Sequence, residues 1–195
     1  MGYGRPLEYD PDKALDAAMH LFWSQGYEAT SLSDLLNAMG LSKSSLYQGF
    51  GGKKELFMRC INRYCDNYAG LFLDLLNKAG SGRSFIEETL LMAANETRRS
   101  EMRRGCLLMN TASEFAQKDP AIAQRVATGF DRFRGVFLAA VERGQREGDI
   151  TTQVDAEPLA SYLMSSMGGL KTVVKGGADE QKVKDIVDII MRALA

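Results

Sequence analysis

Apolar residues recur three to four positions apart along nearly the whole chain, and no segment alternates between apolar and polar residues as a strand does. The repeat is clearest after Pro120. The residues on that stripe are Ile122, Val126, Phe130, Phe133, Phe137 and Val141, and the last segment repeats the pattern with Val183, Ile186, Val187, Ile190 and Leu194. Only four prolines occur in 195 residues, so little breaks these runs. The pattern predicts an all-α protein with about nine helices.

Capping residues and glycines indicate where the helices begin and end. A first amphipathic helix is capped by Asp10 or Asp12 and ends at Gly26. After the Gly51-Gly52 break, a long helix runs from Lys53 to about residue 79. Further helices are expected at about 84–99, 106–117, 120–147, 156–175 and 179–195.

Two short helices between these landmarks have the layout of a helix-turn-helix. Ser31, followed three residues later by Asp34, is a capping-box variant that opens the first of them, and Ser42 caps the second. Gly40 suits the turn between them, because a residue there commonly takes a positive φ. In this motif the second helix reads the major groove with its N-terminal residues. A small core of Leu35, Leu41 and Leu46 would hold the crossing of the two helices.

Positive charge gathers around this motif, although the whole chain has a formal charge of only −1. Between Gly40 and Arg63 there are five cations and one anion, a net charge of +4. The cations are Lys43, Lys53, Lys54, Arg59 and Arg63, and the anion is Glu55. A local positive face is what a small DNA-reading surface needs, and a chance cluster on a solvated helix gives the same count.

The segment from Thr30 to Phe57 resembles the DNA-binding signature of the TetR family of transcriptional regulators. The turn Gly40-Leu41-Ser42, the pattern Tyr47-x-x-Phe50 and the pattern Lys53-x-x-Leu56 all match. Before it, Leu21-Phe22 and Gly26-Tyr27 match the family's first helix and its end. The likeness covers roughly the first 60 residues. It implies a three-helix DNA-binding domain over residues 1–55 and an effector-binding and dimerisation domain over residues 56–195.

The resemblance also implies which residues meet double-stranded DNA. Lys43, Ser44 and Ser45 fall where the family contacts bases or adjacent phosphates, and their small or flexible side chains suit close approach. The complete set of expected DNA-binding residues is Thr30, Ser31, Lys43, Ser44, Ser45, Tyr47, Gln48 and Lys53. A core position is the alternative for Tyr47, and Phe50 is assigned to the core.

Two residues depart from the family pattern. Leu36 stands where the family has a small residue at the helix crossing, which puts the crossing angle in question. Gly49 lies within the reading helix and costs about 0.5–1 kcal/mol relative to alanine. We therefore expect a short or loose reading helix in the absence of DNA.

By the same resemblance, the last two long helices pair with those of a second subunit. The expected seam of this homodimer is Met164, Met167, Gly168, Ile186, Ile190 and Leu194. An intramolecular core is the alternative for these residues. The family also has an effector cavity in its second domain. The residues expected to line it are Tyr64, Tyr68, Met92, Cys106, Asn110, Glu114, Phe133 and Phe137.

Cys106 is the candidate for a reactive thiol. It follows a basic run and should open a helix, and both features favour the thiolate. The Gly-Cys-Leu segment resembles a subset of the family in which some members sense electrophiles or oxidants. Lys171 is a possible partner of this thiol, and a buried, inert cysteine is the alternative. Cys60 and Cys65 are interpreted as packing or surface residues.

These observations favour a regulator over an enzyme. The single histidine, His20, has no nucleophile or metal-ligand pattern around it, and the three cysteines form no metal-ligand spacing, so no cofactor is expected. The sequence shows no signal region and no membrane-spanning run, and we expect a cytoplasmic protein. The resemblance implies a ligand- or redox-responsive repressor that binds a palindromic operator as a homodimer and is released by a small-molecule effector. A regulator that responds to a protein partner instead of a small molecule is the alternative.

Overall fold

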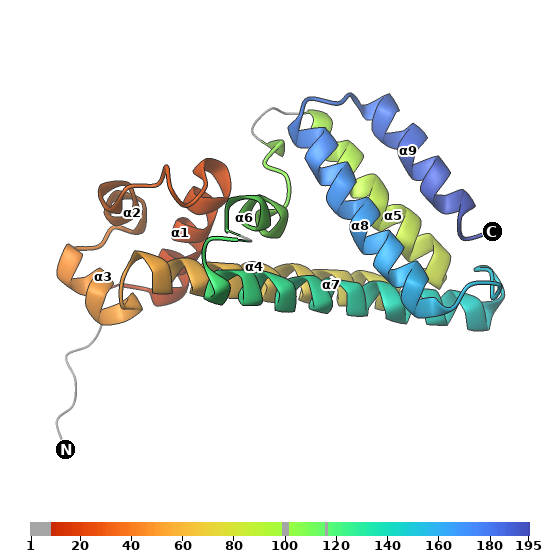
Figure 1. Cartoon of the computed structure of the whole chain (residues 1–195), viewed down its shortest axis with the longest axis horizontal. Helices are drawn as coiled ribbons and strands as arrows, with labels where there is room; N and C mark the ends of the chain where they lie inside the picture. The colour runs from red at the N-terminus through yellow and green to blue at the C-terminus, as the bar shows by residue number, and fades with distance from the viewer. Residues whose placement is uncertain (1–8, 99–101, 116) are drawn as a thin grey trace, which may run out of the picture. The chain divides into compact units, whose positions relative to one another are not determined.

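The computed structural model describes residues 9–98, 102–115 and 117–195, and within these ranges the chain is all-α, as predicted (Figure 1). The helices are α1 Pro11–Gln25, α2 Leu32–Met39, α3 Lys43–Phe50, α4 Lys53–Lys78, α5 Gly82–Asn95, the 3₁₀ helix η1 Glu96–Arg98, α6 Leu107–Phe115, α7 Pro120–Glu147, α8 Ala156–Lys175 and α9 Glu180–Arg192. The bounds of α7 and α8 agree with those predicted. Helix α5 begins two residues before the predicted start, because Ser81 and Ser84 form a reciprocal capping box there.

The first compact unit ends at Tyr64, inside α4. Helix α1 packs against α2, and Phe57 of α4 lies against both Phe22 and Tyr27 with ring centroids 4.9 Å apart. Leu56, Phe57, Cys60 and Ile61 are all buried. The first turns of α4 therefore belong to the core of this unit, and the division falls later than the boundary expected after residue 55.

The second compact unit begins at Cys65. Within it α5, α8 and α9 pack side by side, α7 packs against α5 and α8, and α6 packs against α7 (Figure 1). Gly82 allows the start of α5 to approach α7 closely, because a Cβ there would overlap the carbonyl oxygen of Ala140 and lie 2.5 Å from the Gly144 nitrogen. The core of this unit combines residues of α5, α7, α8 and α9, and the predicted stripes contribute Phe137 and Val141 of α7 and Val183, Val187 and Ile190 of α9.

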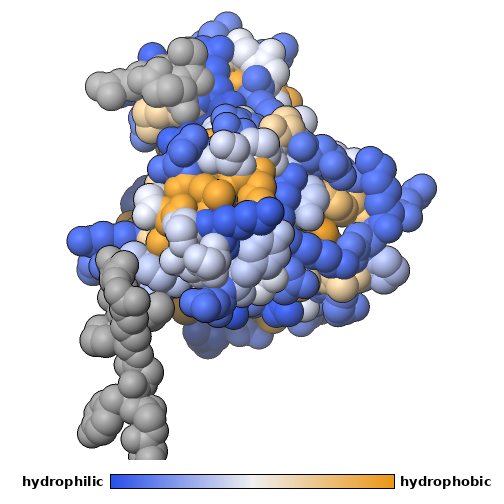
Figure 2. Space-filling view, turned by 90° about the vertical axis from the view of Figure 1, so that its left-hand side faces the viewer, coloured by the Kyte–Doolittle hydropathy of each residue, from blue (hydrophilic) through white to orange (hydrophobic). Residues whose placement is uncertain are grey.

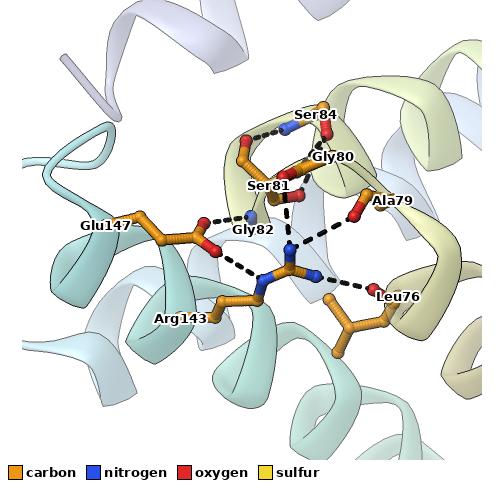
Figure 3. A network of polar contacts seen from close by, with 8 residues as sticks. All are labelled: Leu76, Ala79, Gly80, Ser81, Gly82, Ser84, Arg143 and Glu147. Carbon is orange, nitrogen blue, oxygen red and sulfur yellow. Dashed lines mark hydrogen bonds and ion pairs between the residues drawn. The ribbon is translucent and has the colours of Figure 1, made fainter.

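Arg143 of α7 binds the backbone at the junction between α4 and α5 (Figure 3). The Arg143 guanidinium donates to the carbonyl oxygens of Leu76 (2.8 Å), Ala79 (3.2 Å) and Gly80 (3.2 Å). It also pairs with Glu147 at 2.7 Å, and Glu147 accepts a hydrogen bond from the Gly82 backbone N–H at 2.9 Å. The Gly82 N–H and Arg143 together lower the pKa of Glu147. The end of one helix and the start of the next are thus satisfied by a single ion pair on α7.

None of the helices in the described ranges has the length and apolarity that a membrane span requires. On the face drawn in Figure 2, mostly hydrophilic residues surround a central apolar area, and smaller apolar patches lie apart from it.

Candidate DNA-binding and effector sites

Helices α2 and α3 and the turn between them form the predicted helix-turn-helix. The Ser31 side chain accepts from the Asp34 backbone N–H at 3.1 Å, and the Asp34 carboxylate accepts from the Ser31 backbone N–H at 3.0 Å. The Ser31 hydroxyl, which donates to the same carboxylate at 2.6 Å, and then the Ser31 backbone N–H lower the pKa of Asp34. Gly40 ends α2 with φ +64°, the left-handed conformation that glycine adopts without strain. Leu35, Leu41 and Leu46 are buried, which confirms the predicted core and shows that Leu36 leaves the turn intact.

The N-terminal end of α3 presents small polar side chains and one cation. Ser42 caps the helix by accepting from the Ser45 backbone N–H at 3.1 Å. The hydroxyls of Ser44 and Ser45 lie 2.9 and 2.8 Å from the Ser42 hydroxyl. Lys43 and Ser44 are exposed, and Ser45 is half-buried. The first turn of α3 is therefore rigidly capped and open to a ligand that approaches it.

The second turn of α3 separates exposed from core residues. Tyr47 is 49% exposed and Gln48 is exposed, whereas Phe50 is buried, as predicted. Tyr47 is thus not the core aromatic that was the alternative. Lys53, at the start of α4, lies over the Tyr27 ring at 4.2 Å from its centroid, a cation–π contact that restricts where its ammonium group can go.

The structure corrects two sequence interpretations in this unit. Thr30 is fully buried and its hydroxyl donates to the Gly26 carbonyl at 2.6 Å, so its side chain stabilises the approach to α2 and is not available to DNA. Arg63 forms ion pairs with Asp16 (2.9 Å) and Asp12 (3.1 Å). The hydrogen bond from Arg63 lowers the pKa of Asp16. The charge of Arg63 is therefore compensated on α1, and the positive face is smaller than the sequence count suggests.

Contacts at the end of α3 explain the unusual Gly49. Helix α3 spans eight residues and continues through Gly49 to Phe50, so the glycine does not interrupt it. Arg59 of α4 donates to the Gly49 carbonyl at 2.9 Å. A Cβ at residue 49 would overlap the Tyr9 hydroxyl, so glycine is required for this approach. Tyr9 and Arg59 were not predicted to have this role. A glycine inside a short helix was the only feature of the sequence that pointed to such a close contact.

The effector candidates are divided between the two units. Tyr64 lies in the first unit, where its ring meets Trp23 edge-on at 5.2 Å. In the second unit, Tyr68, Phe72 and Phe133 form a chain of ring contacts at 6.2 and 5.9 Å. Phe137 is a core residue that packs on Phe85, Met92 is 37% exposed and Glu114 is half-exposed. Tyr68, Phe133, Cys106 and Asn110 remain the most coherent group of candidates.

Cys106 lies directly before α6, where the Asn110 backbone N–H donates to its carbonyl at 2.9 Å. It is 8% exposed and close enough to contribute to raising the pKa of Tyr68, behind burial and Glu96. Lys171 is engaged in an ion pair with Glu96. The lysine beside this segment is Lys175, whose ammonium donates to the Asn110 side chain at 2.8 Å. The side chain of Lys175, one turn further along α8 than Lys171, lies against Gly105.

All three cysteines are buried, and Cys60 and Cys65 are buried more deeply than Cys106. Desolvation raises the pKa of Cys60, and it raises the pKa of Cys65 to about 11. Both side chains are therefore thiols at neutral pH, and both are packed in the core as the sequence suggested.

Most of the expected dimer seam lies inside this chain's own core. Met167, Gly168 and Leu194 are buried, and Gly168 faces Met109, whose sulfur would lie 3.1 Å from a Cβ added there. The alternative of an intramolecular core is correct for these residues. Met164 and Ile186 are half-buried and Ile190 is buried. Helices α8 and α9 instead present an apolar groove of about 560 Å³ lined by Tyr162, Ser166, Gly169, Leu170, Val173, Lys182, Asp185, Ile186, Ile189 and Ile190.

A capped reading helix, a left-handed glycine turn and an exposed polar first turn define a helix-turn-helix DNA-binding protein. The chain matches the model of bacterial regulatory proteins of the tetR family over residues 14–60 and the tetracyclin repressor-like C-terminal domain over residues 83–190. It therefore belongs to the TetR family of transcriptional regulators, which bind DNA and are not enzymes.

Full-length relatives agree with this assignment. The chain is 30% identical to the HTH-type transcriptional repressor ComR of Escherichia coli, covering 97% of this chain and 90% of ComR. It is 29% identical to the HTH-type transcriptional regulator YezE of Bacillus subtilis, covering 98% and 99% of the two chains. A cysteine-substituted CifR, a TetR-family regulator solved with 26-base-pair double-stranded operator DNA, is 29% identical with a TM-score of 0.85, covering 98% of this chain and all of that one.

Proposed function

We propose that this regulator is a repressor that binds a palindromic operator as a homodimer and leaves it when an effector acts on the second unit. The observation that carries the DNA-binding part is the first turn of α3, where Lys43, Ser44 and the Ser42 cap are exposed together. Lys53 and Tyr47 supply the phosphate contacts in this account. Two relatives lend support, because ComR is named a repressor and CifR was solved with operator DNA.

The groove between α8 and α9 supports a second copy of the chain as its occupant. Ile189 is 58% exposed and Tyr162 is 39% exposed, large apolar side chains on neighbouring helices. Lys182 and Asp185 border the same groove and offer opposite charges for a two-fold related partner. One reading helix per chain then becomes two per dimer, and the protein symmetry predicts two operator half-sites related by the same axis.

Sedimentation of the wild type and of Ile189→Glu tests the dimer. The wild type should sediment as a dimer at micromolar concentration, and the glutamate should produce monomers, because it would bury a charge in an apolar contact. Asp188→Lys, an exposed change on the same helix outside the groove lining, is the matched control and should remain dimeric. A wild-type monomer both with and without DNA contradicts the proposal.

The effector acts, in this proposal, on the segment at the start of α6 that contains Cys106 and Asn110, and on Tyr68 of α4. Cys106 stands directly before α6, in the segment where Lys175 donates to the Asn110 side chain. Addition of a quinone or aldehyde carbon to this sulfur moves the thiol proton to the oxygen of the adduct, whereas hypochlorite oxidises the sulfur to a sulfenic acid and is reduced to chloride. Each product adds bulk at an 8% exposed position. The segment must then repack. A ligand that binds the same segment without a covalent bond is the competing form of the proposal.

Operator release by a quinone, an aldehyde and hypochlorite separates these forms. The wild type should release operator DNA on treatment, and Cys106→Ser should not. Cys65→Ser is the matched control and should respond like the wild type, because burial holds that group as a thiol. If Cys106→Ser responds like the wild type, the thiol switch is wrong and a non-covalent effector is favoured. If no small molecule releases the DNA, control by a protein partner is favoured instead.

A further inference from the structure

The reading helix α3 is intrinsically weak. It has eight residues, too few for an isolated helix to be stable in water, and Gly49 lies in its last turn. Ser42 satisfies its start, but a helix end also leaves carbonyl groups without intrahelical donors. The shape of α3 must therefore be imposed from outside the helix.

Arg59 of α4 supplies much of that support. Its Nη1 donates to the Gly49 carbonyl at 2.9 Å, and its guanidinium lies over the Phe50 ring at 5.5 Å from the centroid. A cation at this end of a helix also complements the helix dipole. The Gly51 backbone N–H donates to the Tyr47 carbonyl at 3.0 Å. The last turn of α3 is thus held by its own C-cap and by one arginine from the next helix.

Tyr9 holds the same turn from another direction. Its ring lies 6.3 Å from the Phe50 ring, and its hydroxyl occupies the space that a side chain at residue 49 would need. Because Gly49 has no side chain, Tyr9 and Arg59 can both approach the backbone of the reading helix.

We propose that Arg59, assisted by Tyr9, positions the reading helix for base recognition and does so without contacting DNA itself. This inference rests on the proposed operator binding by α3. Base contacts require the helix to be placed within a fraction of an ångström, whereas a lysine on a phosphate tolerates small shifts. Loss of the Arg59 contact should therefore reduce binding to the specific sequence and leave general DNA affinity intact.

The test compares Arg59→Met, Arg59→Lys and wild type on an operator obtained by selection from random duplexes and on a scrambled duplex, over a salt series. Arg59→Met should lower operator affinity by about tenfold, as for one lost hydrogen bond from a charged donor, with an unchanged salt slope and unchanged affinity for the scrambled duplex. Arg59→Lys keeps the charge and one donor and should recover part of the loss. Lys13→Met removes a cation that is 86% exposed on α1 and should match the wild type.

Two outcomes overturn the inference. If Arg59→Met weakens both duplexes equally and lowers the salt slope by about 0.9, Arg59 contacts a phosphate. If it changes neither affinity, the contact has no role in recognition. A wild type that does not prefer the selected sequence contradicts the proposed function instead.

A second pair of variants keeps the test valid if Arg59→Met unfolds the first unit. Gly49→Ala should weaken operator binding, because the new methyl group displaces the Tyr9 hydroxyl. Gly49→Ala combined with Tyr9→Phe should bind like Tyr9→Phe alone, since the ring carbon Cζ lies 3.5 Å from the added Cβ, an ordinary contact. Failure of the phenylalanine to restore binding contradicts the assignment of Tyr9.

Discussion

The ends of α3 and α4 each accept hydrogen bonds from an arginine elsewhere in the chain, and the two arginines differ in burial and in the number of carbonyls that they reach. At the end of α4, Arg143 donates to three carbonyls, pairs with Glu147 and is 27% exposed. At the end of α3, Arg59 donates to one carbonyl and is exposed. The same guanidinium chemistry therefore stabilises a junction of the second unit strongly and the reading helix only weakly. Arg59 positions the last turn of α3 through one carbonyl, whereas Arg143 fixes the end of α4 through three.

Arg143→Met is expected to have the largest effect on stability. The substitution removes the donor to three carbonyls and to one oxygen of the Glu147 carboxylate. We expect a loss of about 2–4 kcal/mol in the free energy of unfolding of the second unit. Urea unfolding followed by circular dichroism measures it. Arg146→Met, an exposed arginine on the same turn of α7, is the control and should change stability by under about 0.5 kcal/mol. Equal losses for both variants would show that the carbonyl contacts contribute little.

The Glu147 carboxylate should make this stabilisation depend on pH. Its pKa in the folded protein is lowered below the ordinary 4.5, chiefly by the Gly82 N–H and then by Arg143. A lowered folded pKa contributes stability that is present above the unfolded value and is lost as the pH falls through the folded value. Glu147→Gln should therefore be less stable than wild type at pH 7, and the difference should close below pH 4.5. A difference that is constant from pH 7 to acid contradicts the assigned cause.

The smallest expected effect on stability is that of Arg59→Met. Since Arg59 is exposed, water can replace its hydrogen bond to Gly49, and we expect a loss of less than about 1 kcal/mol for the first unit. Thermal unfolding of Arg59→Met and Arg143→Met under the same conditions measures the contrast directly. If Arg59→Met is as destabilised as Arg143→Met, Arg59 is a structural residue and the difference between the two helix ends is lost.

Features fixed by neighbouring residues were predictable from the sequence. Ser31 with Asp34, the Gly40 turn and the Ser42 cap act over two or three positions, so the helix-turn-helix could be placed residue by residue. The bounds of α7 followed from Pro120 and the apolar period that begins there.

Features that depend on distant residues were not. The Arg143 bond to Leu76 spans 67 positions, and no local pattern announces it. The burial of Met167, Gly168 and Leu194 was not predictable for a related reason. Both faces of α9 carry isoleucine or valine, and helical period alone does not say that Val187 faces the core while Ile189 faces outward. Thr30 shows the same limit for a polar residue, because its burial depends on how α1 meets α2.

In the proposed function, the first turn of α3 contacts the operator bases and Lys53 binds the DNA backbone. One binding series distinguishes these two roles. Lys43→Ala and Lys53→Ala are titrated with the operator and with a scrambled duplex over a range of salt concentrations. Lys43→Ala should lose about 1–3 kcal/mol more on the operator than on the scrambled duplex. Lys53→Ala should weaken both equally and lower the salt slope by about 0.9. Equal losses for both variants on both duplexes would contradict the account.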